Sequence, residues 1–270
     1  MREANPAKAV QRQFGQQAAY YAVSRPHATG TSLGVMINWA KPTAADRVLD
    51  VATGTGFTAF AFAEAAAEVV ATDITAKMLQ EARRLGAERG FRNIHFLQAA
   101  AETFPFRDKS FDIVTCRIAC HHFASVPAFL GEVRRILGPT GRLVLVDSSS
   151  PEEPDLHTWH QEMERLRDPT HVRNYTPSEW RRFIADAGLT LEELTTSHRT
   201  ELVFSDWVRT SGSPPDVVAE LRRQFIEASP AIREAFRIRA VEEDFHFSWM
   251  LTILLARPKQ RSHLAQSQAS

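Results

Sequence analysis

Short runs of apolar residues alternate along the chain with longer stretches in which apolar residues recur every three or four positions. The first pattern is typical of buried strands and the second of amphipathic helices. The apolar runs predict seven strands, at residues 48–51, 69–72, 93–97, 110–116, 143–146, 189–194 and 245–256. Helical patterns separate most of these runs, and this alternation predicts an α/β fold with a doubly wound, mostly parallel sheet.

The chain divides around this predicted sheet into three parts. Residues 1–45 precede the first strand, with a polar lead-in at 1–13 and a helix at 33–40, and we expect them to form a helical cap. Residues 46–258 form the sheet domain, with a helical insertion at about 199–244 before the last strand. Residues 259–270 are polar and predict a disordered tail.

The turn after the first predicted strand carries glycines at positions 54 and 56. A helical pattern follows at residues 57–67, so the segment has the order strand, glycine turn, helix. This order is the start of a βαβ unit that binds a nucleotide-like ligand. Glycine lets the backbone approach the ligand closely, and the helix N-terminus offers free N–H groups to polar ligand atoms.

Two acidic residues flank this turn. Asp73 ends the second predicted strand, seventeen positions after Gly56, where a carboxylate can accept hydrogen bonds from both hydroxyls of an adenosine ribose. Asp50 lies beside the turn, where it is suited to hold a positive group. The ligand that matches both acids is a cationic adenosine amino acid rather than a pyrophosphate.

Composition narrows the class of partner. The chain carries 32 acidic and 32 basic side chains, and this balance argues against nucleic acid as the main partner. No apolar run approaches the length of a membrane span, and the N-terminus lacks the apolar core of a signal peptide, so cytoplasmic residence is expected. The two cysteines, Cys116 and Cys120, provide no disulfide framework and are expected to be packing residues.

Several motifs, taken in order, resemble those of the class I S-adenosylmethionine-dependent methyltransferases of the type-11, ubiquinone/menaquinone C-methyltransferase-like family. They are Val-Leu-Asp-Val-Ala-Thr-Gly-Thr-Gly at 48–56, Asp73, Ala-Glu-Thr-Phe-Pro-Phe at 101–106, Phe-Asp-Ile-Val at 111–114, His-His-Phe at 121–123 and Leu-Gly-Pro-Thr-Gly-Arg-Leu at 137–143. The resemblance spans about residues 14–258. It implies a Rossmann-like methyltransferase fold of seven strands, the last antiparallel, with S-adenosyl-L-methionine as cofactor.

The resemblance also implies which residues contact the cofactor. They are Asp50, Ala52, Thr53, Gly54, Gly56, Asp73, Ile74, Met78, Ala101, Glu102 and Arg117. The chain departs from the family pattern at Ala52, which replaces the first glycine of the turn, and at Ala100, which replaces an acid that accepts from the adenine amine in many relatives. Adenine would then depend on stacking and on backbone N–H groups near Ala101, and loss of the hydrogen bond would weaken binding by about 0.5–1.5 kcal/mol.

Methyl transfer from a sulfonium needs an oriented nucleophile and, for some acceptors, a base that removes its proton. His121 and His122 follow the fourth predicted strand and are the candidate catalytic residues, because the ordinary pKa of histidine, about 6.5, suits a general base at neutral pH. We favour His122 as the neighbour of cofactor or acceptor; the alternative is that the pair is structural.

The remaining predictions concern the acceptor and metals. The residues predicted to contact the acceptor are Tyr21, His27, His122 and Asp147, although plain packing or helix capping is also open for them. A metal-dependent mechanism needs several oxygen ligands at the strand ends. Arg117 and the histidine pair occupy those positions, so no metal is expected.

Three functions are to be distinguished. The favoured one is methyl transfer to a carbon or oxygen of a small, fairly apolar, quinone- or aromatic-like acceptor, because apolar and aromatic residues dominate the cap and the insertion. A nicotinamide-dependent oxidoreductase would want glycine where Ala59 stands and no acid at Asp50. A non-catalytic S-adenosylmethionine-binding or scaffold protein is supported only by Ala100. The chain could act as a homodimer.

Overall fold

A single mixed sheet forms the centre of the computed structural model, which describes residues 6–22 and 30–260. The strand order is β3-β2-β1-β4-β5-β9-β6, and β7 and β8 also pair with β9. The strands are β1 (Arg47–Val51), β2 (Glu68–Asp73), β3 (Ile94–Gln98), β4 (Phe111–Arg117), β5 (Leu137–Ser149), β6 (Leu189–Thr195), β7 (Arg199–Val203), β8 (Arg239–Val241) and β9 (Asp244–Pro258).

The first five strands are parallel, and β9 runs antiparallel to β5 and β6. The expected doubly wound, mostly parallel sheet with an antiparallel last strand is therefore confirmed. Two short strands, β7 and β8, were not predicted; they bring the sheet to nine strands and flank the helices of the predicted insertion. The division of the chain into cap, sheet domain and insertion stays a prediction.

The helices follow local signals in the sequence. Thr176 and Glu179 form a capping box at the start of one helix, with Pro177 in its first turn, and Ser125 caps another through a hydrogen bond from Ala128 N. No helix within residues 6–22 and 30–260 is long and apolar enough to cross a membrane. The helices are α1 (Pro6–Ala22), α3 (Thr31–Ala40), α4 (Phe57–Ala63), α5 (Ala76–Glu88), α6 (Val126–Ile136), α7 (Pro154–Arg167), α8 (Pro177–Asp186), α9 (Phe204–Ser211), α10 (Pro215–Ile226) and α11 (Pro230–Ala235), with the 3-10 turn η1 (Cys120–His122).

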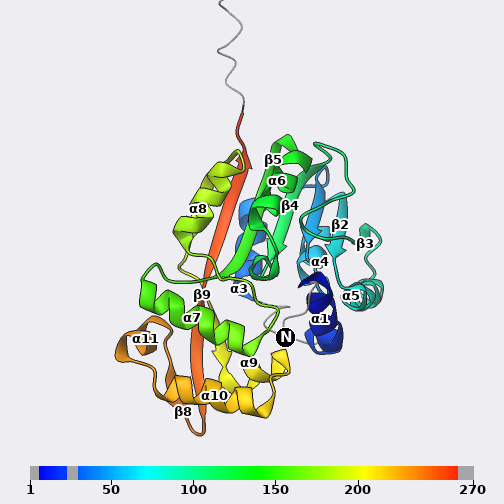
Figure 1. Ribbon diagram of the computed structural model, residues 1–270. Helices are drawn as coiled ribbons and strands as arrows, with labels where there is room; N and C mark the ends of the chain where they lie inside the picture. Colours follow the sequence, from blue (N-terminus) through cyan, green and yellow to red (C-terminus); the bar gives the residue numbers. More distant parts are fainter. Residues whose placement is uncertain (1–5, 23–29, 261–270) are drawn as a thin grey trace, which may run out of the picture.

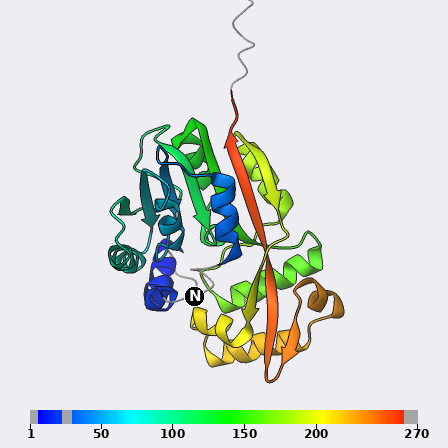
Figure 2. The ribbon, with the colours of Figure 1, turned by 180° about the vertical axis from the view of Figure 1, so that it is seen from behind.

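Alternate side chains of the central strands point to opposite faces of the sheet, and both faces are buried. Leu49 and Val51 belong to the apolar cluster that α6 and α8 cover, whereas Val48 belongs to the cluster that α3 and α4 cover. Figures 1 and 2 show α6 and α8 on one side of the sheet and α3 on the other. This layering keeps α3, α4, α6 and α8 on the two faces of the sheet, and the carboxyl ends of β1, β2 and β4 lie together at one edge.

The last strand continues beyond the central sheet. Residues 250–256 of β9 pair with β5, and residues 244–250 pair with β7 and β8 (Figure 1). Helices α7, α9, α10 and α11 cover this extension with a cluster of large aromatic side chains, which includes Trp159, Trp207, Phe225, Phe247 and Trp249. The helices expected between residues 205 and 240 thus form one wall of apolar and aromatic groups.

The N-terminal segment corrects one prediction. The polar lead-in expected at residues 1–13 is wrong from Pro6 onward, because α1 begins there. Ala7, Val10, Phe14 and Ala18 recur at helical spacing and form one apolar stripe on an otherwise polar helix. The helix packs against α5 and α9. It therefore bridges the end of the sheet and the aromatic part of the molecule.

Candidate functional site

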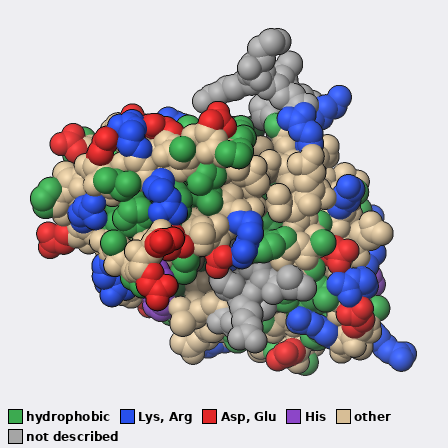
Figure 3. All heavy atoms as spheres, turned by 90° about the horizontal axis from the view of Figure 1, so that it is seen from below, with side chains coloured by type: hydrophobic (Ala, Val, Ile, Leu, Met, Phe, Trp, Pro, Cys, Tyr) green, Lys and Arg blue, Asp and Glu red, His purple; other side chains and the backbone are tan. Residues whose placement is uncertain are grey.

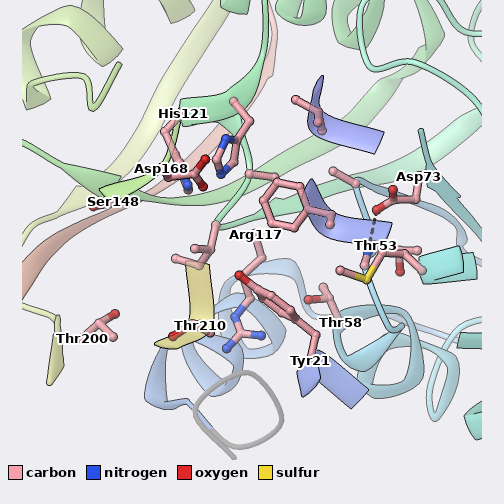
Figure 4. A pocket seen from close by; sticks show the side chains of 18 of the residues that line it. Tyr21, Thr53, Thr58, Asp73, Arg117, His121, Ser148, Asp168, Thr200 and Thr210 are labelled. Carbon is pink, nitrogen blue, oxygen red and sulfur yellow. Dashed lines mark hydrogen bonds between the residues drawn. The ribbon is translucent and has the colours of Figure 1, made fainter. Parts of the chain in front are cut away.

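A cavity of about 850 Å³ lies at the carboxyl ends of β1, β2 and β4 and reaches the wall formed by β7, α9 and β9. This edge of a parallel sheet is the place where ligands bind in α/β folds. Figure 4 shows Thr53 and Asp73 on one side of the cavity and His121 and Asp168 on the other. The predicted cofactor residues and His121 thus face one space from opposite sides, and Asp168 joins His121 there.

The glycine turn forms the floor of this cavity on the β1 side. Ala52, Gly54 and Gly56 all have positive φ angles, of 53°, 55° and 95°. A Cβ on Gly54 would meet nothing within 4 Å, so the missing side chain leaves free space beside the cavity. A Cβ on Gly56 would lie 2.6 Å from Cζ of Phe60, so packing within α4 excludes a side chain there. The lack of a side chain at Gly54 thus keeps space open in the cavity, whereas the lack of one at Gly56 lets the turn pack against Phe60.

Asp50 is almost completely buried at the end of β1. Its two oxygens accept hydrogen bonds from Thr53 Oγ1 at 2.6 Å and Thr115 Oγ1 at 2.7 Å. Burial raises the pKa of Asp50 to about 6, although both hydroxyls and the positive charge of Arg117 work in the opposite direction. A carboxylate in this position gains from a cation brought into the cavity.

Asp73 ends β2 and is held by backbone N–H groups. Its Oδ2 accepts from Gly54 N at 2.9 Å, and its Oδ1 accepts from Thr75 N at 2.8 Å. Burial raises the pKa of Asp73, and the two N–H groups counteract that rise. Each carboxylate oxygen has two lone pairs, so both can still accept from a ribose hydroxyl. Asp73 therefore links the glycine turn to the start of α5 and also lines the cavity.

An apolar slot continues from Asp73 towards β3. Ile74, Met78 and the three alanines at 99–101 line it. Glu102 also reaches the cavity, but its Oε1 accepts from Ala124 N at 3.0 Å. The side chains of this slot offer an apolar packing surface to an adenine ring. Ala100 lines the slot with a methyl group, at the position where many relatives carry an acidic hydrogen-bond acceptor.

The end of β4 brings a cation and a strained residue into the cavity wall. Arg117 donates from Nε to Ser32 Oγ at 3.3 Å, and burial lowers the pKa of its guanidinium group. Ile118 adopts a φ of 54°, which is rare for a β-branched residue, and its N–H donates to Val146 O at 2.7 Å. This bend turns the chain from β4 into η1, where the histidine pair lies.

His121 and Asp147 form a buried pair beside the cavity. His121 Nδ1 lies 2.7 Å from Asp147 Oδ1, and Asp147 is fully buried. Burial works to lower the pKa of His121, but the carboxylate of Asp147 outweighs it, so the pKa is raised. Asp147 does not belong to the residues that line the cavity. The predicted acceptor residue Asp147 thus lies behind His121 rather than on the cavity wall.

His122 differs from its neighbour. Its Nδ1 lies 3.2 Å from Thr170 O. The ring of Phe14 packs edge-on against the imidazole ring, with 4.9 Å between the ring centroids. Burial, with the nearby charge of His121 as the second cause, lowers the pKa of His122 to about 3. His122 therefore stays neutral and is held by packing, so the two histidines have different roles in the wall.

The other predicted site residues are distributed as follows. Every predicted cofactor residue except Gly56 lines the cavity, as do Tyr21, His121 and His122, whereas His27 lies outside the described residues. Cys116 and Cys120 are buried, with their sulfur atoms 3.5 Å apart. No group of three or more His, Cys, Asp or Glu side chains within residues 6–22 and 30–260 is arranged to hold a metal ion.

Sequence reasoning did not select the residues at the end of α7. Arg167 pairs with Glu164 at 3.2 Å and places its guanidinium group over the ring of Trp207, 5.1 Å from the ring centroid. Asp168 accepts from both the N–H and the hydroxyl of Thr170. All of these residues except Thr170 line the cavity. They carry no motif; their only signal is a position in the first helix after the fifth strand.

Comparison with known proteins adds to this geometry. The family model described as a methyltransferase domain matches residues 42–188. The chain is 35% identical to the uncharacterized methyltransferase YcgJ of Bacillus subtilis over 248 residues, which cover 92% of this chain and 98% of the relative. It is 36% identical over 163 residues to the ubiquinone/menaquinone biosynthesis C-methyltransferase UbiE of Dinoroseobacter shibae, covering 58% of this chain and 65% of that protein.

Solved structures agree with these sequence matches. The crystal structure of YcgJ superimposes with a TM-score of 0.79 at 34% identity, covering 85% of this chain and 99% of that one. A putative methyltransferase from Bacillus halodurans superimposes with a TM-score of 0.81 at 33% identity, covering 85% of this chain and all of that one. Fold, motif order and relatives agree, and the chain belongs to the family of S-adenosylmethionine-dependent methyltransferases.

Proposed function

We propose that this enzyme transfers a methyl group to a carbon or oxygen of a small, fairly apolar acceptor with a quinone-like or aromatic ring. The observation that carries the proposal is the 850 Å³ cavity, which joins the acidic ends of β1 and β2 to an aromatic wall. Its volume lies in the range of pockets that enclose small molecules, about 300–1,000 Å³. Cofactor and acceptor would occupy its two ends.

The residues of the β1–β2 end fit S-adenosylmethionine. Gly54 leaves free space at the backbone, Asp73 retains lone pairs for the ribose hydroxyls, and buried Asp50 matches a positive charge. Ile74 and Met78 would pack on the adenine ring. When bound, the cofactor supplies a methyl group activated by a positively charged sulfur. The task of the chain is to hold that group, to exclude water and to orient the acceptor opposite it.

The charge of the cavity supports an acceptor without negative charge. Seven carboxylates and three guanidinium groups occur among the described residues that line it. An excess of carboxylates disfavours phosphorylated or other anionic acceptors and favours a cationic cofactor with a neutral acceptor. On the face seen from below, acidic and basic side chains are interspersed (Figure 3). That mixture gives no support to a nucleic-acid acceptor on this face.

Apolar groups at the far end support a ring-shaped acceptor. Trp207, Trp249, Leu202 and Leu251 line this end, and Phe14 and Tyr21 of α1 add two further aromatic rings to the cavity wall. Aromatic walls favour flat apolar rings through stacked or edge-on contacts. The relatives named for ubiquinone and menaquinone synthesis act on molecules of this kind, which adds support for the acceptor class but not for one particular acceptor.

Two measurements test the proposal. Isothermal titration should show micromolar binding of S-adenosylmethionine, weakened at least tenfold in Asp73→Ala, because the ribose contacts are lost. Incubation of the enzyme with a metabolite extract and a labelled methyl donor, followed by mass identification, should yield a methylated ring compound without phosphate. Binding without any labelled product would favour a scaffold protein, and a labelled macromolecule or phosphate ester would contradict the acceptor class.

A further inference from the structure

The described cavity wall contains two histidines, and they are held in different ways. His121 Nδ1 faces the carboxylate of Asp147, whereas His122 Nδ1 lies 3.2 Å from both the carbonyl oxygen and the hydroxyl of Thr170, neither of which is charged. A carboxylate only accepts hydrogen bonds, so in the neutral ring of His121 the hydrogen is on Nδ1 and the lone pair is on Nε2. The His121 side chain remains 13% exposed and lines the cavity. Nε2 is therefore the nitrogen that is free to receive a proton.

We propose that His121 is the general base of methyl transfer and that Asp147 is its positioning residue. This inference rests on the proposed function and names the acceptor more closely: the atom to be methylated carries a hydrogen that ionises. A phenol, quinol or enol hydroxyl, or the ring carbon made acidic by such an oxygen, meets this requirement. A base adds roughly 10²–10⁴ to the rate of such reactions.

The proposed step balances in atoms and charge. The acceptor O–H or C–H bond breaks, and its proton passes to Nε2 of His121. The electron pair left on the acceptor forms the bond to the methyl carbon, and the electrons of the broken carbon–sulfur bond stay on sulfur. The imidazolium that results is stabilised by Asp147, whose second oxygen, Oδ2, is buried without a hydrogen-bond partner among the described residues.

The groups around His121 favour a positive charge on its ring rather than on the two neighbouring histidine rings. Three carboxylates face it: Asp147 from β5, Glu164 from α7 and Asp168 from the end of that helix. The neighbouring rings are His122 of η1, which is neutral, and His171, whose ring centroid lies 5.6 Å away. Burial, and then the charge of His121, lowers the pKa of His171 as well. Neither neighbour competes for the proton.

A histidine titration by NMR on the full chain without cofactor tests the pair directly. We expect one histidine with a pKa above its ordinary value, which disappears in His121→Gln and remains in His95→Gln, an exposed histidine on β3. Asp147→Asn should lower that pKa, because the carboxylate that raises it is lost. A titration unchanged by Asp147→Asn, or assigned to another histidine, would overturn the inference.

Turnover supplies the second readout, with the extract assay and labelled methyl donor. His121→Gln should lose roughly 10²–10⁴ in rate while its affinity for S-adenosylhomocysteine stays within about threefold of wild type. Since only the neutral ring accepts a proton, the rate should rise with pH through the raised pKa of His121. In Asp147→Asn that rise should move to lower pH, an effect that a purely structural role would not produce.

The two proposals fail in different ways. A wild-type enzyme that neither binds S-adenosylhomocysteine nor labels any product contradicts the proposed function and, with it, the role of His121. An enzyme that does both, while His121→Gln remains as active as wild type, contradicts only the role of His121.

Discussion

The buried carboxyl group of Asp50 should make cofactor binding depend on pH. Its pKa is raised to about 6, and a sulfonium is attracted only by the ionised form. Affinity for S-adenosylmethionine, measured by isothermal titration, is therefore expected to rise between about pH 5 and pH 7 and to level off above. Asp50→Asn should bind more weakly at pH 8 and lose this dependence; a retained dependence would assign it to another group.

In the ligand-free protein, the raised pKa of Asp50 should make the free energy of unfolding fall with rising pH, whereas the affinity for the cofactor rises. A carboxyl group whose pKa rises from 3.8 to about 6 on folding stabilises the folded state below pH 3.8, and this contribution is lost as the pH rises through 6. Asp50→Asn removes the buried charge, so it should raise the free energy of unfolding at pH 8 by about 1–3 kcal/mol. Urea unfolding without ligand checks this, and a destabilised variant would contradict it.

A single substitution at Ala100 should increase the affinity for the adenine-containing ligand. An acid there could accept from the adenine amine, because residue 100 lines the slot next to Ile74 and Met78. Ala100→Asp is expected to tighten S-adenosylhomocysteine binding by about 0.5–1.5 kcal/mol, up to roughly tenfold. The matched control is the N6,N6-dimethyl analogue, which has no amine hydrogen and should gain nothing. Equal gains for both ligands would argue against adenine in this slot.

At the scale of elements, α10 offers a matched pair of adjacent residues. Phe225 is fully buried against Phe204 and Phe247, whereas Ile226 is 60% exposed. Phe225→Ala should therefore lower the free energy of unfolding by about 3–5 kcal/mol, because it leaves a cavity in the aromatic cluster. Ile226→Ala should change it by less than about 0.5 kcal/mol. Similar losses for both variants in urea unfolding would mean that this helix end is packed differently.

The sequence predicted those strands whose own hydrophobic pattern identifies them. The apolar runs of β1, β2, β4 and β9 are buried on both faces, so hydrophobicity alone marked them. It was less informative for β7 and β8, which are short, polar and exist because β9 offers them an edge. Helix α1 was missed because its apolar stripe is narrow and most of its residues are polar. These elements depend on contacts that are distant along the chain.

In the candidate site, too, the residues of a local motif could be predicted from the sequence, whereas contacts between distant segments could not. Asp50, Gly54 and Asp73 lie in one local motif, and their shared place at the sheet edge follows from the parallel topology. The partnership of His121 with Asp147 spans 26 positions and depends on the register of β4 against β5, which no local pattern reports. The residues of α7 approach the cavity only because that helix packs against the aromatic cluster.

At the scale of the whole molecule, the sheet and the aromatic part should unfold together. One uninterrupted strand of 15 residues, β9, belongs to both, and α1 joins them through Gln11 to Ile74 O and Gln13 to Ser211 O. Three of the five tryptophans, Trp159, Trp207 and Trp249, belong to the aromatic cluster, so a large part of the tryptophan fluorescence reports on it, whereas far-UV circular dichroism reports on all helices and strands. We expect the two signals to change at the same urea concentration; an earlier fluorescence change would show that the aromatic part unfolds alone.

The order in which the ribosome delivers the chain has a consequence for β9. This strand pairs with β5, β6, β7 and β8, yet it emerges during translation after all the other strands of residues 6–22 and 30–260. Until it does, β5 exposes a row of unpaired N–H and C=O groups, which is a template for pairing with other nascent chains. We therefore expect a chain cut short before residue 244 to aggregate rather than to act as a smaller enzyme, because the edge of β5 stays open.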